Sequence, residues 1–208
     1  MEDILSVYAR PYDKNRPVVC MDEKPYQLLG NSRESLQMKV GAVQKVDYEY
    51  KRNGTCSIFV FTEPLDCWRY LQAFEQRTRR EWAYCIEWLL TEQYPDAEKV
   101  VLIMDNLNTH TLSSLYEAFL PEEAFHLAQR LELHYTPKHG SWLNIAEIEL
   151  SALTLQCLGQ RRIPNMKLLN KELAAWHIRR NRNQKGVEWH FTTQEARIKL
   201  KKLYPTIL

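Results

Sequence analysis

The chain has 208 residues, of which 45% are hydrophobic and 26% are charged. These values predict one soluble globular domain that is large enough to bury a core. The chain has no apolar run long enough to span a membrane, and its polar N-terminus lacks a signal peptide's apolar core. Five scattered cysteines without a CxxC pair indicate reduced thiols in a cytoplasmic protein, and they argue against a disulfide framework or a zinc site.

Charge is unevenly distributed along the chain, although the net charge is only +2. Residues 160–208 contain 12 Lys and Arg against 3 Asp and Glu, whereas residues 1–159 contain 16 against 23. Such asymmetry favours a contact between the basic part and a polyanion. The alternative is a basic helical face that is only solvated, and charge alone does not decide between the two.

The first part of the chain is typical of an antiparallel meander. Residues 1–16 are expected to be a short lead-in, and residues 17–21 (PVVCM) predict a buried strand that ends at Asp22. Residues 31–45 are polar and are predicted to form a loop. The other predicted elements are an alternating strand from Val46, a hairpin turn at Asn53-Gly54, a strand at residues 56–62 and a strand from Trp68.

Helices and strands alternate in the second part. Thr78 and Glu81 form a capping box for a helix that ends near Pro95, and a buried strand at residues 100–104 then runs into Asp105. The elements predicted after it are a helix at residues 113–130 interrupted at Pro121, a strand at 131–135, a helix capped by Ser141 from 142 to about 158, a helix at 166–182, and a helix after the capping box of Thr192 and Glu195.

This order of elements predicts an α/β fold. Its sheet is mixed, with an antiparallel meander plus parallel strands, helices on both faces and a helical C-terminal part. The strands that end at Asp22 and Asp105 can lie side by side in such a sheet, so the two aspartates would be neighbours at an edge where functional residues gather. The alternative for Asp105 is that it only caps the turn that follows it.

A third carboxylate comes from the helix predicted after Ser141. At about 100° per residue, the residues that gather on its core-facing side are Leu143, Ala146, Leu150, Leu153 and Cys157. Glu147 lies at the edge of this stripe, whereas Glu149 is expected nearly opposite, towards solvent. A carboxylate beside the core is costly unless it is paired or binds a metal. Glu147 is therefore the candidate ligand, with a salt bridge as the alternative.

Three converging carboxylates would repel one another and therefore require cations. Ligand sets made only of oxygen suit Mg²⁺ or Mn²⁺. Two such ions can activate a water or hydroxyl and stabilise the leaving oxygen of a phosphodiester. The pattern of acids therefore predicts metal-dependent phosphodiester chemistry.

Three segments together resemble the catalytic domain of the mariner-like DDE transposases, in particular their bacterial insertion-sequence relatives. They are Asp22-Glu23-Lys24, the segment MDNLNTHT around Asp105, and YTPKHGSWLNIAEIE, which is the most specific. The resemblance covers about residues 17–160, and the basic C-terminal part is also similar to the tail of such proteins. It implies an RNase H-like fold and DNA strand cleavage followed by strand transfer. The implied parts are a lead-in at 1–16, a catalytic core at 17–160 and a basic helical extension at 161–208 that packs on the core.

The resemblance also assigns residues to roles. Asp22, Asp105 and Glu147 match the catalytic triad of the family and would bind two Mg²⁺ or Mn²⁺ ions. The surrounding motif positions, which would order the site or contact DNA, are Asn106, His110, Lys138, His139, Ser141 and Asn144. A direct catalytic role stays open for His110 and His139. The basic residues predicted to contact the DNA backbone are Arg161, Arg162, Lys167, Lys171, Arg179, Arg180 and Arg182.

The implied partner is double-stranded DNA, at transposon ends and at the target, bound by a homodimer. Two features depart from the family. Asp105 and Glu147 are 42 positions apart, several more than usual, with the extra residues expected at 119–130. The lead-in is also too short for the family's helix-turn-helix modules, which predicts an isolated catalytic domain or a transposase with a separate DNA-binding half. The rival functions are an RNase H-like nuclease or resolvase without strand transfer, and a non-catalytic remnant that binds DNA or a partner chain.

Overall fold

A computed structural model describes residues 1–33, 39–41, 48–159, 161–184, 186–187 and 189–204. Its centre is a five-stranded sheet with the order β3-β2-β1-β4-β5. The strands are β1 (Val18–Asn31), β2 (Tyr50–Glu63), β3 (Trp68–Phe74), β4 (Val100–Met104) and β5 (Leu131–Tyr135). The first three form the antiparallel meander, and β4 pairs in parallel with both β1 and β5. The predicted mixed sheet is therefore confirmed.

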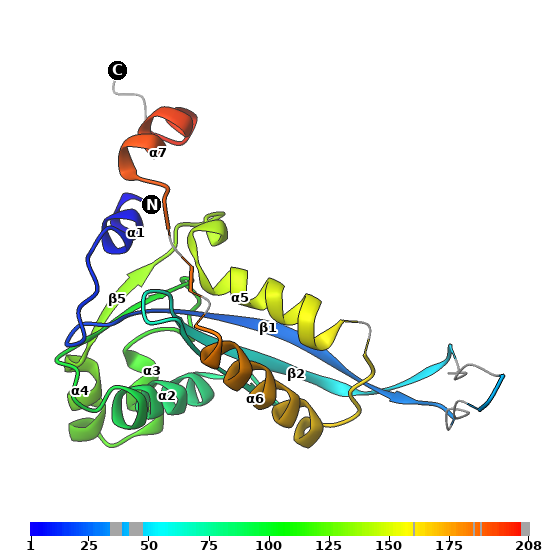
Figure 1. Ribbon diagram of the computed structural model, residues 1–208. Helices are drawn as coiled ribbons and strands as arrows, with labels where there is room; N and C mark the ends of the chain where they lie inside the picture. The colour runs from blue at the N-terminus through cyan, green and yellow to red at the C-terminus, as the bar shows by residue number, and fades with distance from the viewer. Residues whose placement is uncertain (34–38, 42–47, 160, 185, 188, 205–208) are drawn as a thin grey trace.

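Helices cover both faces of this sheet (Figure 1). One face carries α1 (Glu2–Tyr8), α5 (Ala146–Leu153) and α6 (Met166–Arg182), and α7 (Thr193–Lys199) packs against α1 beyond the sheet. The other carries α2 (Arg79–Trp88), α3 (Ser113–Ala118) and α4 (Pro121–Gln129). Short π-helical turns, Leu89–Gln93 and Thr154–Leu158, extend α2 and α5, and 3₁₀ turns occur at Ser141–Leu143 and Lys201–Leu203. Within the described ranges, no helix is long and apolar enough to cross a membrane.

Alternate residues of β4 supply the cores on the two faces. Val101 and Ile103 pack with the α5 layer, whereas Leu102 and Met104 pack with the α2 layer. This alternation is the two-residue period of a strand, and it explains why the segment is apolar without interruption. The predicted burial of this strand on both faces is confirmed, because all five of its residues are buried.

Several local predictions are confirmed. The capping boxes at Thr78 and Thr192 both start helices, and the helical stretch after residue 112 breaks before Pro121. The lead-in differs from its prediction because it contains α1, whose Ile4, Leu5 and Val7 are buried in the core. All five cysteines are free thiols.

The Asn53-Gly54 dipeptide does not form the predicted hairpin turn. It lies inside β2, where the register against β1 shifts between Gln27 and Leu29 so that β2 has one extra residue. Gly54 has a φ of 97°, which suits glycine and marks a β-bulge. The same dipeptide serves turns and bulges, so the long partner strand decides between them. Val46, from which the alternation was predicted, and most of the predicted loop lie outside the described residues.

The first strand is also longer than predicted. β1 continues through Asp22 to Asn31 because β2 pairs with it along that whole stretch, whereas its parallel pairing with β4 stops at Cys20. Asp22 therefore lies inside a strand, at the point where β4 no longer flanks it.

The helix predicted from residue 142 begins four residues later. Ser141 makes no cap, and Asn144 is extended, with φ −86° and ψ 110°. The side chain of Asn144 donates to the backbone oxygen of Met21 at 2.8 Å, which holds the chain against β1 before α5 starts at Ala146. This break also removes Leu143 from the helical wheel.

Glu149 is not directed to solvent, and that prediction is wrong. Ala146, Glu149, Leu150 and Leu153 form one buried stripe at helical spacing, and Glu149 is 0% exposed. Arg180 of α6 donates to both of its carboxylate oxygens, at 2.9 and 3.1 Å, and the Nε of Arg69 lies 3.1 Å from it. Glu149 thus neutralises two arginines between α5, α6 and β3.

The helix α6 also covers the outer edge of β3. Its Asn170 and Asn181 accept hydrogen bonds from the backbone amides of Ala73 and Arg69, at 2.8 and 3.0 Å. These contacts satisfy edge groups that would otherwise be open to another chain. Leu169, Leu173 and Trp176 of α6 belong to the same core as the sheet. The first part of the basic extension is therefore packed against the meander.

We predict that Glu149→Gln lowers the free energy of unfolding by about 3–5 kcal/mol, because it leaves Arg69 and Arg180 buried without their counter-charge. Urea denaturation measures the change. The matched control is Glu147→Gln on the same helix, where the side chain is exposed and the change should stay within about 0.5 kcal/mol. Equal losses in the two variants would contradict the buried ion cluster.

Candidate active site

The register between β1 and β4 aligns Asp22 with Asp105. Val18, Val19 and Cys20 pair with Val101, Leu102 and Ile103. The same register continued by two residues puts Asp22 level with Asp105, and neighbouring strands are about 4.8 Å apart. Side chains two positions apart in a strand point to the same face, so Asp22 lies on the face of Cys20 and Asp105 on the face of Ile103. Cys20 and Ile103 belong to the same core cluster. Both aspartates therefore belong to the α5 side.

Asp22 is held by two neighbours. Its Oδ1 accepts from the backbone N–H of Glu23 at 2.7 Å, and its Oδ2 accepts from the Asn144 side chain at 3.3 Å. Burial raises the pKa of the Asp22 carboxyl to about 6, and repulsion by Asp105, Glu147 and Glu23 acts in the same direction. The three predicted acids are thus near enough to interact electrostatically.

Glu147 faces Asp22 across a cleft of about 560 Å³ between β1 and α5. The residues that line it are Asp22, Glu23, Lys24, Pro25, Glu147, Leu150, Ser151, Thr154 and Leu155. Asp105 does not line this cleft and reaches Asp22 from the β4 side. Glu147 lies in the first turn of α5, where the amide of its own backbone donates to the Asn144 carbonyl at 3.1 Å. Asn144 therefore connects both acids.

Asp105 and Glu23 are joined by His110. The imidazole Nδ1 lies 2.7 Å from Asp105 Oδ1, and Nε2 lies 2.9 Å from Glu23 Oε1. Burial lowers the pKa of His110, but the hydrogen bonds to Asp105 and Glu23 outweigh it and raise the pKa to about 9. Each ring nitrogen lies beside a carboxylate oxygen, which accepts hydrogen bonds, so the arrangement suits a ring that donates from both nitrogens. The sequence did not single out Glu23 for a role, and its only local signal is its position beside Asp22.

Tyr8 supports the segment before α5. Its hydroxyl donates to the Leu143 carbonyl at 2.7 Å and accepts from the Ile145 amide at 3.3 Å. These bonds flank Asn144, so α1 and Asn144 together fix the start of α5 relative to Asp22. This role of the N-terminal segment was not visible in the sequence, because the contact spans most of the chain.

No three His, Cys, Asp or Glu side chains among the described residues are clustered tightly enough to form a ready-made metal site. The donors nevertheless fit a hard cation, because carboxylate oxygens are what Mg²⁺ and Mn²⁺ prefer. A cation would also relieve the repulsion that contributes to the raised pKa of Asp22. Asp105 is held by His110 at one oxygen but is 40% exposed at its side chain, and the exposed Glu147 can turn towards Asp22.

The other predicted motif residues are not gathered at this point. Asn106, Lys138, His139 and Ser141 are exposed, and their side chains make no hydrogen bond or ion pair with the three acids. His139 has a φ of 62°, an uncommon conformation for a residue other than glycine. Among these six motif residues, only His110 and Asn144 contact the acids directly.

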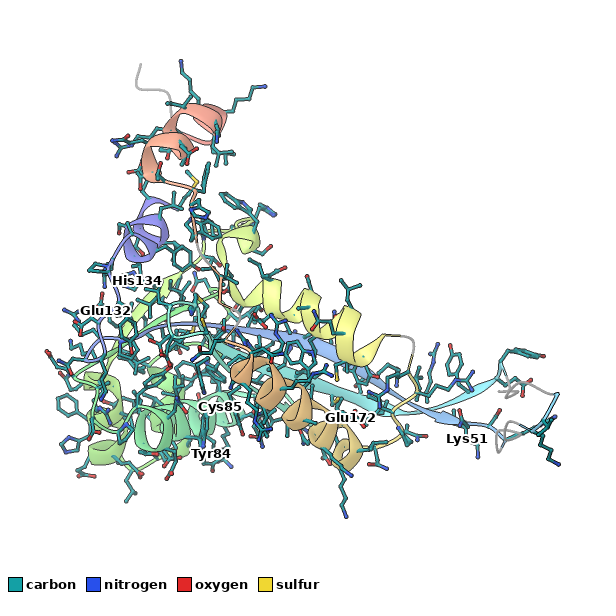
Figure 2. The ribbon with its side chains drawn as sticks, viewed as in Figure 1. Lys51, Tyr84, Cys85, Glu132, His134 and Glu172 are labelled. Atoms are coloured by element: carbon teal, nitrogen blue, oxygen red, sulfur yellow. The ribbon has the colours of Figure 1, made fainter. Side chains whose placement is uncertain are left out.

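The seven predicted DNA-contacting residues divide into two groups. Arg161 binds Glu172 at 2.9 Å, Arg162 donates to Asn31 at 3.1 Å, and Arg180 binds Glu149. Arg180 is only 14% exposed, so a structural role replaces its predicted phosphate contact. The residues of the set that are exposed and form no ion pair within the described part of the chain are Lys167, Lys171, Arg179 and Arg182. Figure 2 labels Glu172 on α6, the partner of Arg161.

A family model described as DDE superfamily endonuclease matches residues 17–170. No curated protein matches the chain in sequence. Three similar solved structures are of the Mos1 mariner transposase. A paired-end complex with Mn has 16% identity and a TM-score of 0.57, with 88% of this chain and 55% of that chain covered. A strand transfer complex has 16% identity and a TM-score of 0.57, and the match covers 88% of this chain and 56% of that chain. The catalytic domain alone has 15% identity and a TM-score of 0.57, and the match covers 88% of this chain and 84% of that chain.

This chain therefore spans about half the length of the chains in the two DNA complexes. At such identities the likeness concerns the fold, and it confirms the predicted RNase H-like arrangement of a mixed sheet with helices.

We predict that Asn144→Ala lowers the free energy of unfolding by about 1–3 kcal/mol, because the buried carbonyl of Met21 loses its donor. Urea denaturation measures the loss. The matched control, Asn106→Ala, alters an exposed amide and should stay within about 0.5 kcal/mol. An Asn144→Ala protein as stable as this control would show that the contact with β1 is dispensable.

Proposed function

Because the chain belongs to the DDE superfamily of endonucleases, we propose that it cleaves DNA with divalent metal ions and then transfers the strand, as the catalytic domain of a transposase. The observation that carries the proposal is the alignment of Asp22 with Asp105 across β1 and β4, with Glu147 facing them from α5. Three carboxylates on one side of the sheet are the parts such chemistry requires.

Asp22 and Asp105 would hold Mg²⁺ or Mn²⁺ between them, and Glu147 would complete a second site. The chemistry that two bound ions supply is activation of a water or a DNA 3′-hydroxyl and stabilisation of the leaving oxygen. The protein contributes position: the Glu23 amide and Asn144 orient the Asp22 carboxylate, and α5 presents Glu147 at the cleft. The Mn in the Mos1 paired-end complex supports the choice of metal.

Double-stranded DNA is the proposed partner. The similar structures include a Mos1 paired-end complex with the left transposon end and a Mos1 strand transfer complex, which supports the same kind of substrate here. The exposed Lys167, Lys171, Arg179 and Arg182 along α6 would contact phosphates without reading sequence. We further propose a homodimer on DNA and recognition of the transposon ends by a separate DNA-binding part.

The test follows plasmid nicking and the appearance of joined products, with Mg²⁺ or Mn²⁺. The wild type should nick and join, whereas Asp105→Asn and Glu147→Gln should do neither. Both ions should also raise the melting temperature of the wild type, because a ligand of the folded state stabilises it, and Asp105→Asn should lose that response. The control Glu123→Gln removes an exposed acid on α4 and should behave as the wild type.

Nicking without joining would favour the rival nuclease or resolvase. A wild type that neither nicks DNA nor responds to metal would leave only the non-catalytic remnant.

A second prediction concerns the exposed arginines of α6. Replacement of Arg179 and Arg182 by Ala should weaken DNA binding and reduce the slope of log K against log salt by about 2, since each lost phosphate contact removes about 0.9. The control is Arg10→Ala with Arg16→Ala, an equal change of charge at residues that bind Glu132 on β5. DNA titrations at several salt concentrations measure the affinity and the salt slope. An equal decrease of both in the two double variants would contradict a local contact between α6 and DNA.

A further inference from the structure

Glu23 is connected to both aspartates of the candidate site. Its backbone N–H donates to Asp22 Oδ1 at 2.7 Å. Its side-chain Oε1 accepts from His110, whose other ring nitrogen donates to Asp105 Oδ1 at 2.7 Å. Glu23 and His110 thus connect Asp22, which lies inside β1, with Asp105, which follows the end of β4.

The alternation of β1 explains this loop. Asp22 points to the α5 side of the sheet, so Glu23 points to the α2 side, where it is 3% exposed at its side chain. β4 ends at Met104, and the chain turns back so that His110 fills the space beyond the strand. From there its ring reaches Glu23 on one side and Asp105 on the other.

His110 is itself firmly fixed. Its amide donates to the Leu107 carbonyl at 3.0 Å, and its carbonyl accepts from the Tyr135 hydroxyl at 2.9 Å. The ring stacks on Trp82, with 6.1 Å between the ring centroids, and only 1% of the side chain is exposed. A side chain with so little freedom can hold the orientation of a neighbour that is itself exposed.

The contrast between the two ends of the bridge argues for more than neutralisation of a buried acid. Glu23 is not neutralised by His110 alone, because its Oε1 lies 2.9 Å from Nε2 while its Oε2 lies 3.7 Å from Arg77 Nη1. The other nitrogen is directed at Asp105, which is 40% exposed and would be solvated without it. His110 therefore fixes one oxygen of Asp105, whereas Oδ2 accepts no hydrogen bond from the described residues and stays available as a ligand atom.

We propose that Glu23 and His110 form a positioning relay that sets the orientation of the Asp105 carboxylate towards a divalent cation shared with Asp22. The proposal rests on the proposed function, since it assumes that these aspartates are the ligands. Neither Glu23 nor His110 binds the cation in it. Partners that orient metal ligands by hydrogen bonds typically change metal affinity about 10–100-fold when they are removed.

The experiment measures Mn²⁺ affinity by calorimetry, without DNA and without turnover. His110→Ala and Glu23→Ala should each weaken binding about 10–100-fold. The double variant should lose no more Mn²⁺ affinity than the single variant with the larger loss, because residues that act through one another give non-additive effects. Binding losses that simply add, or affinities equal to the wild type, would overturn the relay.

His134 provides a matched control. It also bridges two carboxylates, Asp3 at 2.7 Å and Glu132 at 3.0 Å, and it contacts none of the three acids. Figure 2 shows Glu132 and His134 together beside α1. His134→Ala should keep the Mn²⁺ affinity of the wild type. A loss equal to that of His110→Ala would mean that any His–carboxylate bridge has this effect, and the relay would be wrong.

A conservative variant separates positioning from packing. His110→Asn can place an amide N–H near the position of Nδ1, so it should recover part of the Mn²⁺ affinity that His110→Ala loses. The melting temperature without metal reports the packing cost separately. If His110→Ala does not fold, the Mn²⁺ affinities of His110→Asn and Glu23→Ala test the relay instead. His110→Asn keeps a donor to Asp105, whereas Glu23→Ala removes the carboxylate that holds the His110 ring.

The same measurements distinguish this inference from the proposed function. If the wild type binds no Mn²⁺, or if Asp105→Asn binds it equally well, the proposed metal site is wrong and the relay with it. If the wild type binds Mn²⁺ through Asp105 while both relay variants bind as tightly, only the relay is wrong.

Discussion

The short parallel pairing of β1 with β4 is the constraint on which the site depends. Only Val18, Val19 and Cys20 take part on the β1 side, and their partners in β4 are buried on both faces. Burial of these apolar side chains fixes the register, because a slip of one residue would move each of them to the opposite face. The same slip would turn Asp22 away from α5. The position of the catalytic candidate is thus set by the apolar residues that precede it.

The third acid reaches the sheet through polar contacts, not through apolar packing alone. Asn144 connects α5 to β1, and Glu149 holds the same helix against Arg69 and Arg180. Removal of three charged groups from water is costly, and apolar residues of similar volume often serve stability as well or better. What such a cluster adds is a defined orientation, because the two oxygens of Glu149 are both engaged. Glu147, two positions earlier, is thereby directed away from the cluster and towards the cleft.

Local signals in the sequence predicted local structure well. The capping box at Thr78 and the apolar run before Asp105 determine their elements within a few residues, and both are confirmed. The hairpin turn predicted at Asn53-Gly54 was wrong because a turn and a bulge share that sequence signal, and only the partner strand distinguishes them. The position of Glu149 was predicted wrongly because the helical wheel included Leu143, which lies before the break that precedes α5, and because its partners Arg69 and Arg180 come from β3 and α6. The link from Glu23 to Asp105 passes around the end of β4, so no spacing in the sequence could indicate it.

The three acids are constrained to different degrees, and this has a physical reason. Asp22 accepts two hydrogen bonds and Asp105 accepts one from His110, whereas Glu147 accepts none from the described residues. Three rigid carboxylates at close range would repel one another at full strength in the folded protein. Two fixed aspartates with one exposed glutamate avoid most of that cost, since the Glu147 side chain can rotate into solvent. Under the proposed function, the sheet would define where a cation binds, and α5 would supply a third ligand whose side chain is free to approach it.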